Sequence, residues 1–228
     1  MKVVNHGPNL TQLVRVGFVN AYLVREEDGL TLVDTMLPGS EKDVLAAAEE
    51  LGAPIVRIVL THAHGDHIGS VDALARALPD AEVLISERDA RFLTGDKSLD
   101  QSEQQGKLRG GYKKIDTKPT GALTPGGQIG SLEVVASPGH TPGHVSLLDT
   151  RDRTLIAGDA FSTFGGVATA AQVNPRFPLV GMATWHRPTA ADSARALRAL
   201  EPSRLATGHG SVVNAPGAAM DRAIAKSS

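Results

Sequence analysis

The chain has 228 residues, of which 41% are hydrophobic, enough apolar material for a single domain over residues 1–228 with its own core. Its 23 Lys and Arg nearly balance 25 Asp and Glu, and the formal charge of -2 argues against a surface that gathers nucleic acid. Cysteine is absent, which excludes disulfides, thiolate metal sites and cysteine nucleophiles. Imidazole and carboxylate groups remain as the strong metal ligands.

The sequence gives no sign of a leader or a membrane segment. Residues 1–7 are polar and lack the basic start and apolar middle of a secretory signal. No run of about 18 consecutive apolar residues suggests a membrane-spanning helix. We therefore expect a cytoplasmic protein that has no membrane partner.

The first half of the chain alternates between strand and helix patterns. Apolar runs at 21–24 and 30–33 flank a turn at 26–29, which is typical of a hairpin. The next predicted elements are a helix over 40–51, a strand over 55–60, a helix over 70–78 and a strand over 83–85. The strand at 55–60 is a continuous β-branched run, as expected where both faces of a strand are buried.

A polar segment at about 89–120 interrupts this pattern and is interpreted as a surface insertion. Between residues 107 and 118 this segment carries five basic side chains against only Asp116, namely Lys107, Arg109, Lys113, Lys114 and Lys118. Two interpretations stay open: a solvated lysine-rich loop, or a patch that steers an anionic substrate.

The second half of the chain again shows predicted strands followed by a helix. Its predicted elements are strands over 128–129, 132–135, 145–148 and 154–157, a helix over 190–200 and a strand over 204–207. Strand clusters and helices that alternate in two similar halves predict a layered α/β domain.

Metal-binding residue types follow four of these predicted strands. His62, His140, Asp159 and His209 each come just after an apolar strand run. Loops beyond the strand ends of an α/β sheet collect at one edge, so residues far apart in sequence can meet there on a common ligand. We expect these four positions to converge.

The segment His62-Ala63-His64-Gly65-Asp66-His67 concentrates imidazoles and a carboxylate in a chain with only 8 His. Alternation in an extended loop sends His62 and His64 to the same side, and a turn at Gly65 re-aims Asp66 and His67 beside them. Crowded imidazoles gain little from one another in water, whereas a divalent cation gives them a reason to meet. The segment therefore predicts a metal site with two neighbouring positions.

The complete arrangement resembles the metallo-β-lactamase superfamily, and in particular its glyoxalase II-like group. The resemblance is carried by the segment from His62 to His67, by Pro138-Gly139-His140-Thr141, by Gly158-Asp159 and by Gly208-His209-Gly210. Order and spacing both match, from the strands that precede Asp34 to the final histidine.

The resemblance implies a fold and a set of roles. The fold would be an αββα sandwich, in which two mixed β-sheets lie face to face, helices flank them and the metals lie at one edge. One ion would be bound by His62, His64 and His140. The other would be bound by Asp66, His67 and His209. Asp159 would bridge the pair. Imidazoles and carboxylates suit zinc, or iron or manganese where supply favours them.

Such a site implies hydrolysis of a small-molecule substrate. Two cations make a bound hydroxide available near neutral pH and polarise the substrate's carbonyl or phosphoryl oxygen. Asp66 is a candidate for steering the hydroxide or passing a proton to the leaving group, beside its role as ligand. The sequence contains no Gly-x-Ser-x-Gly elbow and no Walker-type phosphate loop, which fits a reaction without a nucleophilic side chain.

Several further residues have open roles. Asp34 is a candidate to hold the far nitrogen of a ligand histidine, or else caps a loop, and His144 is a candidate for a similar outer position, or else is structural. The long loop 161–188 contains apolar side chains that pack in the core or line a substrate pocket: Phe161, Phe164, Phe177, Met182 and Trp185.

Departures from individual branches of the superfamily narrow the substrate. The absence of cysteine and the presence of Asp159 argue against a β-lactamase, and Ser162 stands where quorum-quenching lactonases have tyrosine. The short chain after His209 leaves little room for a glutathione-binding helical region. We expect a hydrolase of an ester, thioester or lactone. The alternatives are an iron-dependent sulfur dioxygenase and a protein that binds metal without turnover, and the oligomeric state stays open.

Overall fold

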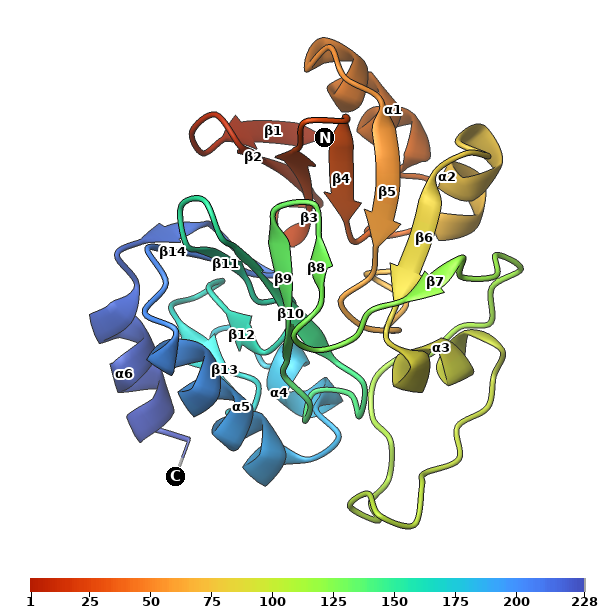
Figure 1. Ribbon diagram of the computed structural model, residues 1–228. Helices are drawn as coiled ribbons and strands as arrows, with labels where there is room; N and C mark the ends of the chain where they lie inside the picture. The colour runs from red at the N-terminus through yellow and green to blue at the C-terminus, as the bar shows by residue number, and fades with distance from the viewer. Residues whose placement is uncertain (228) are drawn as a thin grey trace.

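The computed structural model describes residues 1–227, which form two sheets with helices outside (Figure 1). The first sheet runs in sequence order through β1 (Lys2–Asn5), β2 (Leu10–Arg15), β3 (Val19–Arg25), β4 (Leu30–Val33), β5 (Ile55–Val59), β6 (Glu82–Ile85) and β7 (Gly121–Ala122). Strands β1 to β4 pair antiparallel, and β4 to β7 pair parallel. The sheet is therefore mixed.

The second sheet is mixed as well. In spatial order it contains β15 (Val213–Asn214), β14 (Arg204–Ala206), β11 (Thr154–Ile156), β10 (Val145–Asp149), β9 (Leu132–Ala136) and β8 (Gln128–Ile129). The pair β11 and β14 is parallel, and the other neighbours are antiparallel. A small separate pair is formed by β12 (Phe161–Ser162) and β13 (Ala168–Thr169).

Helices cover the outer face of each sheet (Figure 1). The helices are α1 (Glu41–Glu50), α2 (Val71–Ala77), α3 (Glu87–Leu93), α4 (Leu179–Ala183), α5 (Arg187–Ala199) and α6 (Gly217–Ala225). Buried side chains of α1, α2 and α3 pack against the first sheet, and those of α5 and α6 pack against the second. None of the helices in residues 1–227 combines the length and apolar character that spanning a membrane requires.

The two-residue period of the strands divides their side chains between these layers. On β4, Leu32 faces the helices, while its neighbour Val33 faces the second sheet. Val33 meets Val134 and Leu147 of the second sheet in a shared core between the sheets. Strands buried on both faces explain the continuous apolar runs in the sequence. The predicted αββα sandwich is confirmed.

The structure differs from the sequence expectations mainly in short elements. Strands β1, β7, β12, β13 and β15 and helices α3, α4 and α6 were not expected. All of them except the nine-residue α6 have two to seven residues, too few for a readable periodicity. Helix α5 begins earlier than expected, at Arg187, where His186 accepts a hydrogen bond from the backbone of Thr189 as N-cap. Residues 94–120 form an extended connection without a helix or named strand, and their interpretation as an insertion stays a prediction.

Replacing Leu147 with alanine tests the shared core. Leu147 is fully buried between the sheets, so Leu147→Ala is expected to lower the free energy of unfolding by about 2–5 kcal/mol. The exposed Val3 is the control, and Val3→Ala is expected to change it by less than about 0.5 kcal/mol. Chemical denaturation measures both values, and equal effects would contradict a common inter-sheet core.

Candidate metal centre

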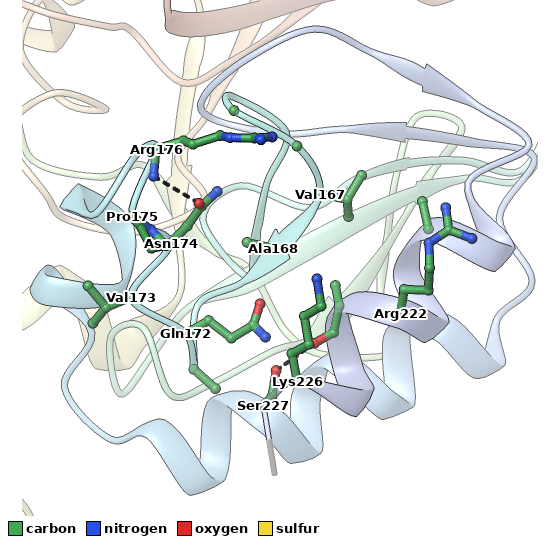
Figure 2. A pocket seen from close by; sticks show the side chains of 15 residues that line it. Val167, Ala168, Gln172, Val173, Asn174, Pro175, Arg176, Arg222, Lys226 and Ser227 are labelled. Atoms are coloured by element: carbon green, nitrogen blue, oxygen red, sulfur yellow. Dashed lines mark hydrogen bonds between the residues drawn. The ribbon is translucent and has the colours of Figure 1, made fainter.

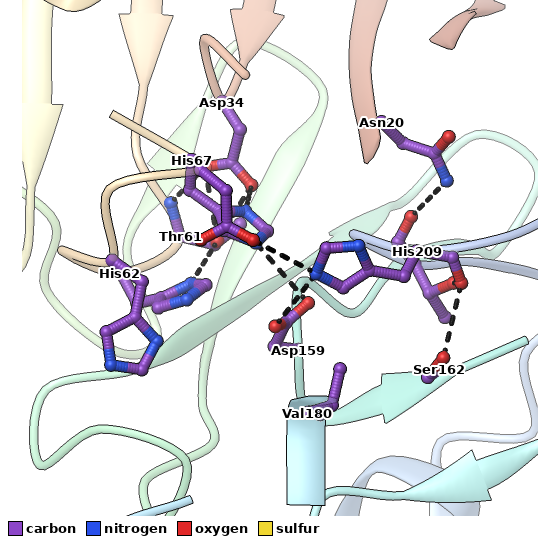
Figure 3. Close-up of polar contacts among 12 residues, drawn as sticks. Asn20, Asp34, Thr61, His62, His67, Asp159, Ser162, Val180 and His209 are labelled. Carbon is purple, nitrogen blue, oxygen red and sulfur yellow. Dashed lines mark hydrogen bonds and ion pairs between the residues drawn. The ribbon is translucent and has the colours of Figure 1, made fainter. Parts of the chain in front are cut away.

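Loops from both sheets meet at one edge of the sandwich and bring the candidate ligands together (Figure 3). The loop after β5 supplies His62, His64, Asp66 and His67, the turn between β9 and β10 supplies His140, the turn after β11 supplies Asp159 and the turn after β14 supplies His209. All are buried except Asp66, whose side chain is 38% exposed. Asp66 therefore marks the open side of the site.

Ligand atoms of these side chains fall into three overlapping groups, each with its atoms within 4.8 Å of one another. The groups are His62, His64 and His140; His62, His67 and Asp159; and Asp66, His67 and His209. The first and third share no residue, so the geometry offers two neighbouring positions for a cation.

Asp159 lies between the two positions. Its Oδ1 is 3.5 Å from His67 Nε2, and its Oδ2 is 3.3 Å from Nε2 of both His140 and His209. One carboxylate thus faces imidazoles of both groups.

In the group of Asp66, His67 and His209, each imidazole donates a hydrogen bond from its outer nitrogen, Nδ1, to an acceptor. His67 Nδ1 donates to Asp34 Oδ2 over 2.8 Å, and His209 Nδ1 donates to the carbonyl oxygen of Phe18 over 3.3 Å. A ring nitrogen that donates leaves the other nitrogen with a free lone pair. Nε2 of both rings therefore faces the carboxylates, where it either carries a proton or binds a cation.

The imidazoles of the first group follow the same rule. His62 Nδ1 lies 3.0 Å from the hydroxyl of Thr61, which itself donates to Asp34. His64 Nε2 donates to the carbonyl of Arg109, and His140 Nδ1 donates to the hydroxyl of Thr184, each over 3.0 Å. The nitrogens left over, Nδ1 of His64 and Nε2 of His62 and His140, face the shared space, and those of His64 and His140 lie 2.9 Å apart.

Several of these inward atoms have no partner within residues 1–227. His62 Nε2, His67 Nε2 and Asp159 Oδ1 are buried and make no hydrogen bond there. An unpaired buried polar atom costs about 1–3 kcal/mol, so a cluster of them calls for a ligand. Imidazole and carboxylate donors in this number fit divalent cations such as zinc.

Asp34 ends β4 in the left-handed region, with φ of 62°. This turn places its carboxylate under the motif, where it accepts from the backbone and hydroxyl of Thr61 as well as from His67. A strained residue held by several hydrogen bonds commonly serves a site. Asp34 orients two of the candidate imidazoles, one directly and one through Thr61.

His144 packs its ring 5.1 Å from that of His62 and makes its hydrogen bond to the site through the backbone. Its Nδ1 donates to Ser137 Oγ over 2.8 Å, and its Nε2 accepts from the backbone amide of Asp159 over 3.0 Å. Burial lowers the pKa of His144 to about 3, so the ring stays neutral and keeps this acceptor. His144 therefore fixes the turn that presents Asp159.

Burial and crowding keep the first group neutral. Burial lowers the pKa of His64 to about 4, and burial together with neighbouring imidazoles lowers the pKa of His62 and His140 well below the usual value. Neutral imidazoles are the form that binds a metal ion.

The carboxylates change the balance in the second group. Burial alone would lower the pKa of His67 and His209, but the negative charges around them outweigh it. Asp159 is the largest opposing influence on both, and it helps to raise the pKa of His209 to about 9 and that of His67 well above its usual value. The same attraction outweighs burial at Asp66 and Asp159 and holds their pKa values low. The carboxylates therefore favour positive charge beside them, as protons on the imidazoles or as metal ions.

The connection at 106–113 lies against the first group. The backbone amide of Gly65 donates to Gly111 over 2.8 Å, and His64 and Tyr112 form an isolated bridge with ring centroids 4.7 Å apart. A Cβ at Gly110, where φ is 84°, would collide with the His64 ring. The basic segment noted in the sequence therefore borders the site, on the side of His64.

The aromatic residues of the 161–188 loop separate into two sets. Phe161 of β12 is fully buried in the core under α5 and α6, whereas the ring of Phe177 lies 5.2 Å from that of His209, centroid to centroid, and packs with Phe164 and Phe18. Met182 is exposed on α4. The contribution of Phe18 was missed, because it lies in a turn far upstream in the sequence.

A cavity of about 760 Å³ elsewhere on the molecule is separate from this cluster (Figure 2). It lies between the β12–β13 connection and α6, and its polar lining includes Arg176, Arg222 and Lys226. None of the candidate ligands lines it within the described part of the chain. The volume of a cavity is therefore not a guide to the position of the candidate metal centre.

Comparison with known proteins identifies the family of this chain. Residues 14–209 match the family model described as the metallo-beta-lactamase superfamily. A relative from Bacillus subtilis (strain 168), "Uncharacterized protein YobT", is 51% identical over 209 residues, covering 91% of this chain and 90% of the relative. The "Probable metallo-hydrolase YflN" of the same organism is 30% identical, covering 86% and 81% of the two chains.

Solved structures with a similar fold extend this comparison. The structure described as TTHA1623 in a di-iron-bound form has a TM-score of 0.67 and 25% identity and covers 90% of this chain and 93% of its own. A metallo-beta-lactamase from Pontibacter korlensis has a TM-score of 0.72 at 17% identity, covering 99% and 98%. With its αββα layers, its ligand motif in order and a family match over most of its length, this chain belongs to the metallo-β-lactamase superfamily.

Proposed function

We propose that this protein is a metal-dependent hydrolase that binds two divalent ions and acts on a small-molecule ester, thioester or lactone. The observation that carries the proposal is the common orientation of the five imidazoles. Each has one nitrogen fixed by an acceptor and the other directed to a space shared with Asp159 and Asp66. Histidines with a purely structural role are not expected to direct a free nitrogen to one common space.

The proposed ligands divide between the two positions. His62, His64 and His140 hold one ion, Asp66, His67 and His209 hold the other, and Asp159 is shared. Zinc is the expected metal, with iron or manganese as the alternatives that this donor set accepts. Asp34, Thr61, Thr184 and His144 orient the ligands from behind.

When bound, a pair of divalent cations lowers the pKa of a water molecule toward neutrality and polarises the substrate's carbonyl oxygen. The chain's own residues supply the rest. Burial of the imidazoles excludes bulk water from one side, and the exposed Asp66 leaves the other side open to a substrate. As the exposed carboxylate of the site, Asp66 is our candidate for passing a proton to the leaving group.

Relatives support this class of substrate. "Hydroxyacylglutathione hydrolase" from Xanthomonas axonopodis pv. citri (strain 306) is 30% identical over 143 residues, although this chain covers only 46% of its length. A near-neutral charge gives no support for a nucleic-acid substrate. The di-iron form of TTHA1623 keeps the iron-dependent oxygenase as the rival, and oxygen uptake with a persulfide separates the two.

Metal content and turnover of the His64→Ala variant test the proposal. The wild type is expected to bind two ions per chain and to turn over members of a panel of activated esters, thioesters and lactones. The variant is expected to lose one ion and to slow by about 100-fold or more, since each cation contributes several kcal/mol to stabilising the transition state. Elemental analysis and initial rates measure both.

The control is His6→Ala, because His6 is a half-buried histidine that bonds Gln12 away from the cluster. It is expected to keep the metal and the rate. A His64→Ala protein that loses metal but keeps its rate would show that the proposed chemistry is wrong.

Ion binding is also expected to release protons. Raised pKa values mean that the rings of His67 and His209 are positively charged at pH 7 and carry a proton on Nε2 as well as on Nδ1. An ion that binds Nε2 displaces that proton, so about two protons should leave on loading. Because the proton competes with the ion, affinity is expected to weaken as the pH falls below about 9. Titration calorimetry in buffers of different ionisation enthalpy measures the release, and His209→Ala should release about one proton fewer. Proton-neutral loading would contradict the assignment of these two ligands.

A further inference from the structure

Asp89 is a fully buried carboxylate that the ligand motif does not include. It lies in the first turn of α3, in the segment that the sequence marked as a polar insertion. Acidic residues in the first turn of a helix are common and usually exposed. A buried one requires partners.

Its partners come from the two loops that carry the first group of candidate ligands. Asp89 Oδ2 accepts from the backbone amide of Ala63 over 3.0 Å and from the hydroxyl of Thr141 over 2.7 Å. Its Oδ1 accepts from the backbone amide of Gly143 over 2.7 Å. Ala63 separates His62 from His64, and Thr141 follows His140. One carboxylate therefore touches the backbone neighbours of every ligand in the group.

No cation accounts for this burial within residues 1–227. The adjacent Arg88 pairs with Glu103 and lies over the ring of Phe92. The three contacts of Asp89 are hydrogen bonds from neutral groups, each of which favours the charged form. A buried carboxylate without a cation costs stability, so its retention indicates a role that an apolar residue would not fill.

The fit around Asp89 is close. Ser86 Oγ donates to the carbonyl of Gly143 over 2.6 Å while Asp89 accepts from the amide of the same residue. A Cβ at Gly143 would lie 2.6 Å from Ser86 Oγ and 2.7 Å from Asp89 Oδ1. The start of α3 therefore binds both backbone polar groups of Gly143, in the turn after His140.

Asp34 and Asp89 act on the site in different ways. Asp34 orients imidazole rings, that of His67 directly and that of His62 through the hydroxyl of Thr61. Asp89 accepts no hydrogen bond from an imidazole and joins the two loops of the first group through the amides of Ala63 and Gly143 and the hydroxyl of Thr141. A bridge between loops fixes the distance between ligands rather than the orientation of one ring.

We propose that Asp89 is a positioning residue that sets the spacing of His62 and His64 against His140 and thereby tunes affinity for the ion at the first position. The proposal rests on the proposed metal-dependent function. It assigns to α3 a part in the site, although α3 supplies no ligand.

Asp89→Asn tests the proposal in two backgrounds that each leave one position. An amide places donor hydrogens against groups that already donate, so the bridge is lost with little change in volume. With His209→Ala, which leaves the first position, Asp89→Asn is expected to weaken zinc affinity by about 10- to 100-fold. With His64→Ala, which leaves the second position, the affinity is expected to stay nearly unchanged. Competition with a chromogenic chelator measures both.

Two further variants guard against a folding effect. Thr141→Val removes one of the three donors, and a smaller loss of affinity at the first position is expected even if Asp89→Asn does not fold. Asp149→Asn is the matched control, because Asp149 is a buried aspartate at the opposite end of β10 with Arg151 as its partner. It is expected to leave both affinities unchanged.

The outcomes separate the proposals. Unchanged affinity at the first position in both Asp89→Asn and Thr141→Val, or an equal loss at both positions, overturns the role of Asp89. A wild type that binds no zinc overturns the proposed function itself, and this is seen before any variant is compared.

Discussion

Positive charge is what this edge of the sandwich requires. Asp34, Asp66 and Asp159 bring carboxylates among imidazoles that are largely cut off from water. Buried carboxylates without compensation cost several kcal/mol each, so either protons or metal ions must lie between them. The acceptors behind each ring leave its inward nitrogen free for such a cation. The surrounding loops can be understood as the means of holding that arrangement.

The sheets are joined at the same edge, which makes the arrangement rigid. The backbone amide of Asn20 in the first sheet donates to Gly208 over 2.9 Å, and the buried hydroxyl of Tyr22 donates to the carbonyl of Thr207 over 2.7 Å. From the other side, the amide of Val145 in the second sheet donates to Thr61 over 3.0 Å. Each of these contacts lies within two residues of a candidate ligand. Packing of the inter-sheet core thus fixes the separation of groups contributed by different sheets.

The sequence predicted the layers and the inward-facing residues because both leave local patterns. Buried strands give apolar runs, and a metal motif concentrates rare residue types. The groups behind the rings leave no such pattern. His64 is held by the backbone carbonyl of Arg109, and any residue type supplies that atom. Thr184 and Asp89 are ordinary residues whose roles arise only when distant loops meet.

The candidate ligands are spread along the chain, from the loop after β5 to the turn after β14, and this spread has a consequence for biosynthesis. A growing polypeptide exposes the motif from His62 to His67 well before His209 exists. Until then a cation meets a partial set of donors on an incomplete first half. Under the proposed function, stable metal binding would therefore require the second half of the chain to fold against the first, and metal supply would couple to maturation of the protein.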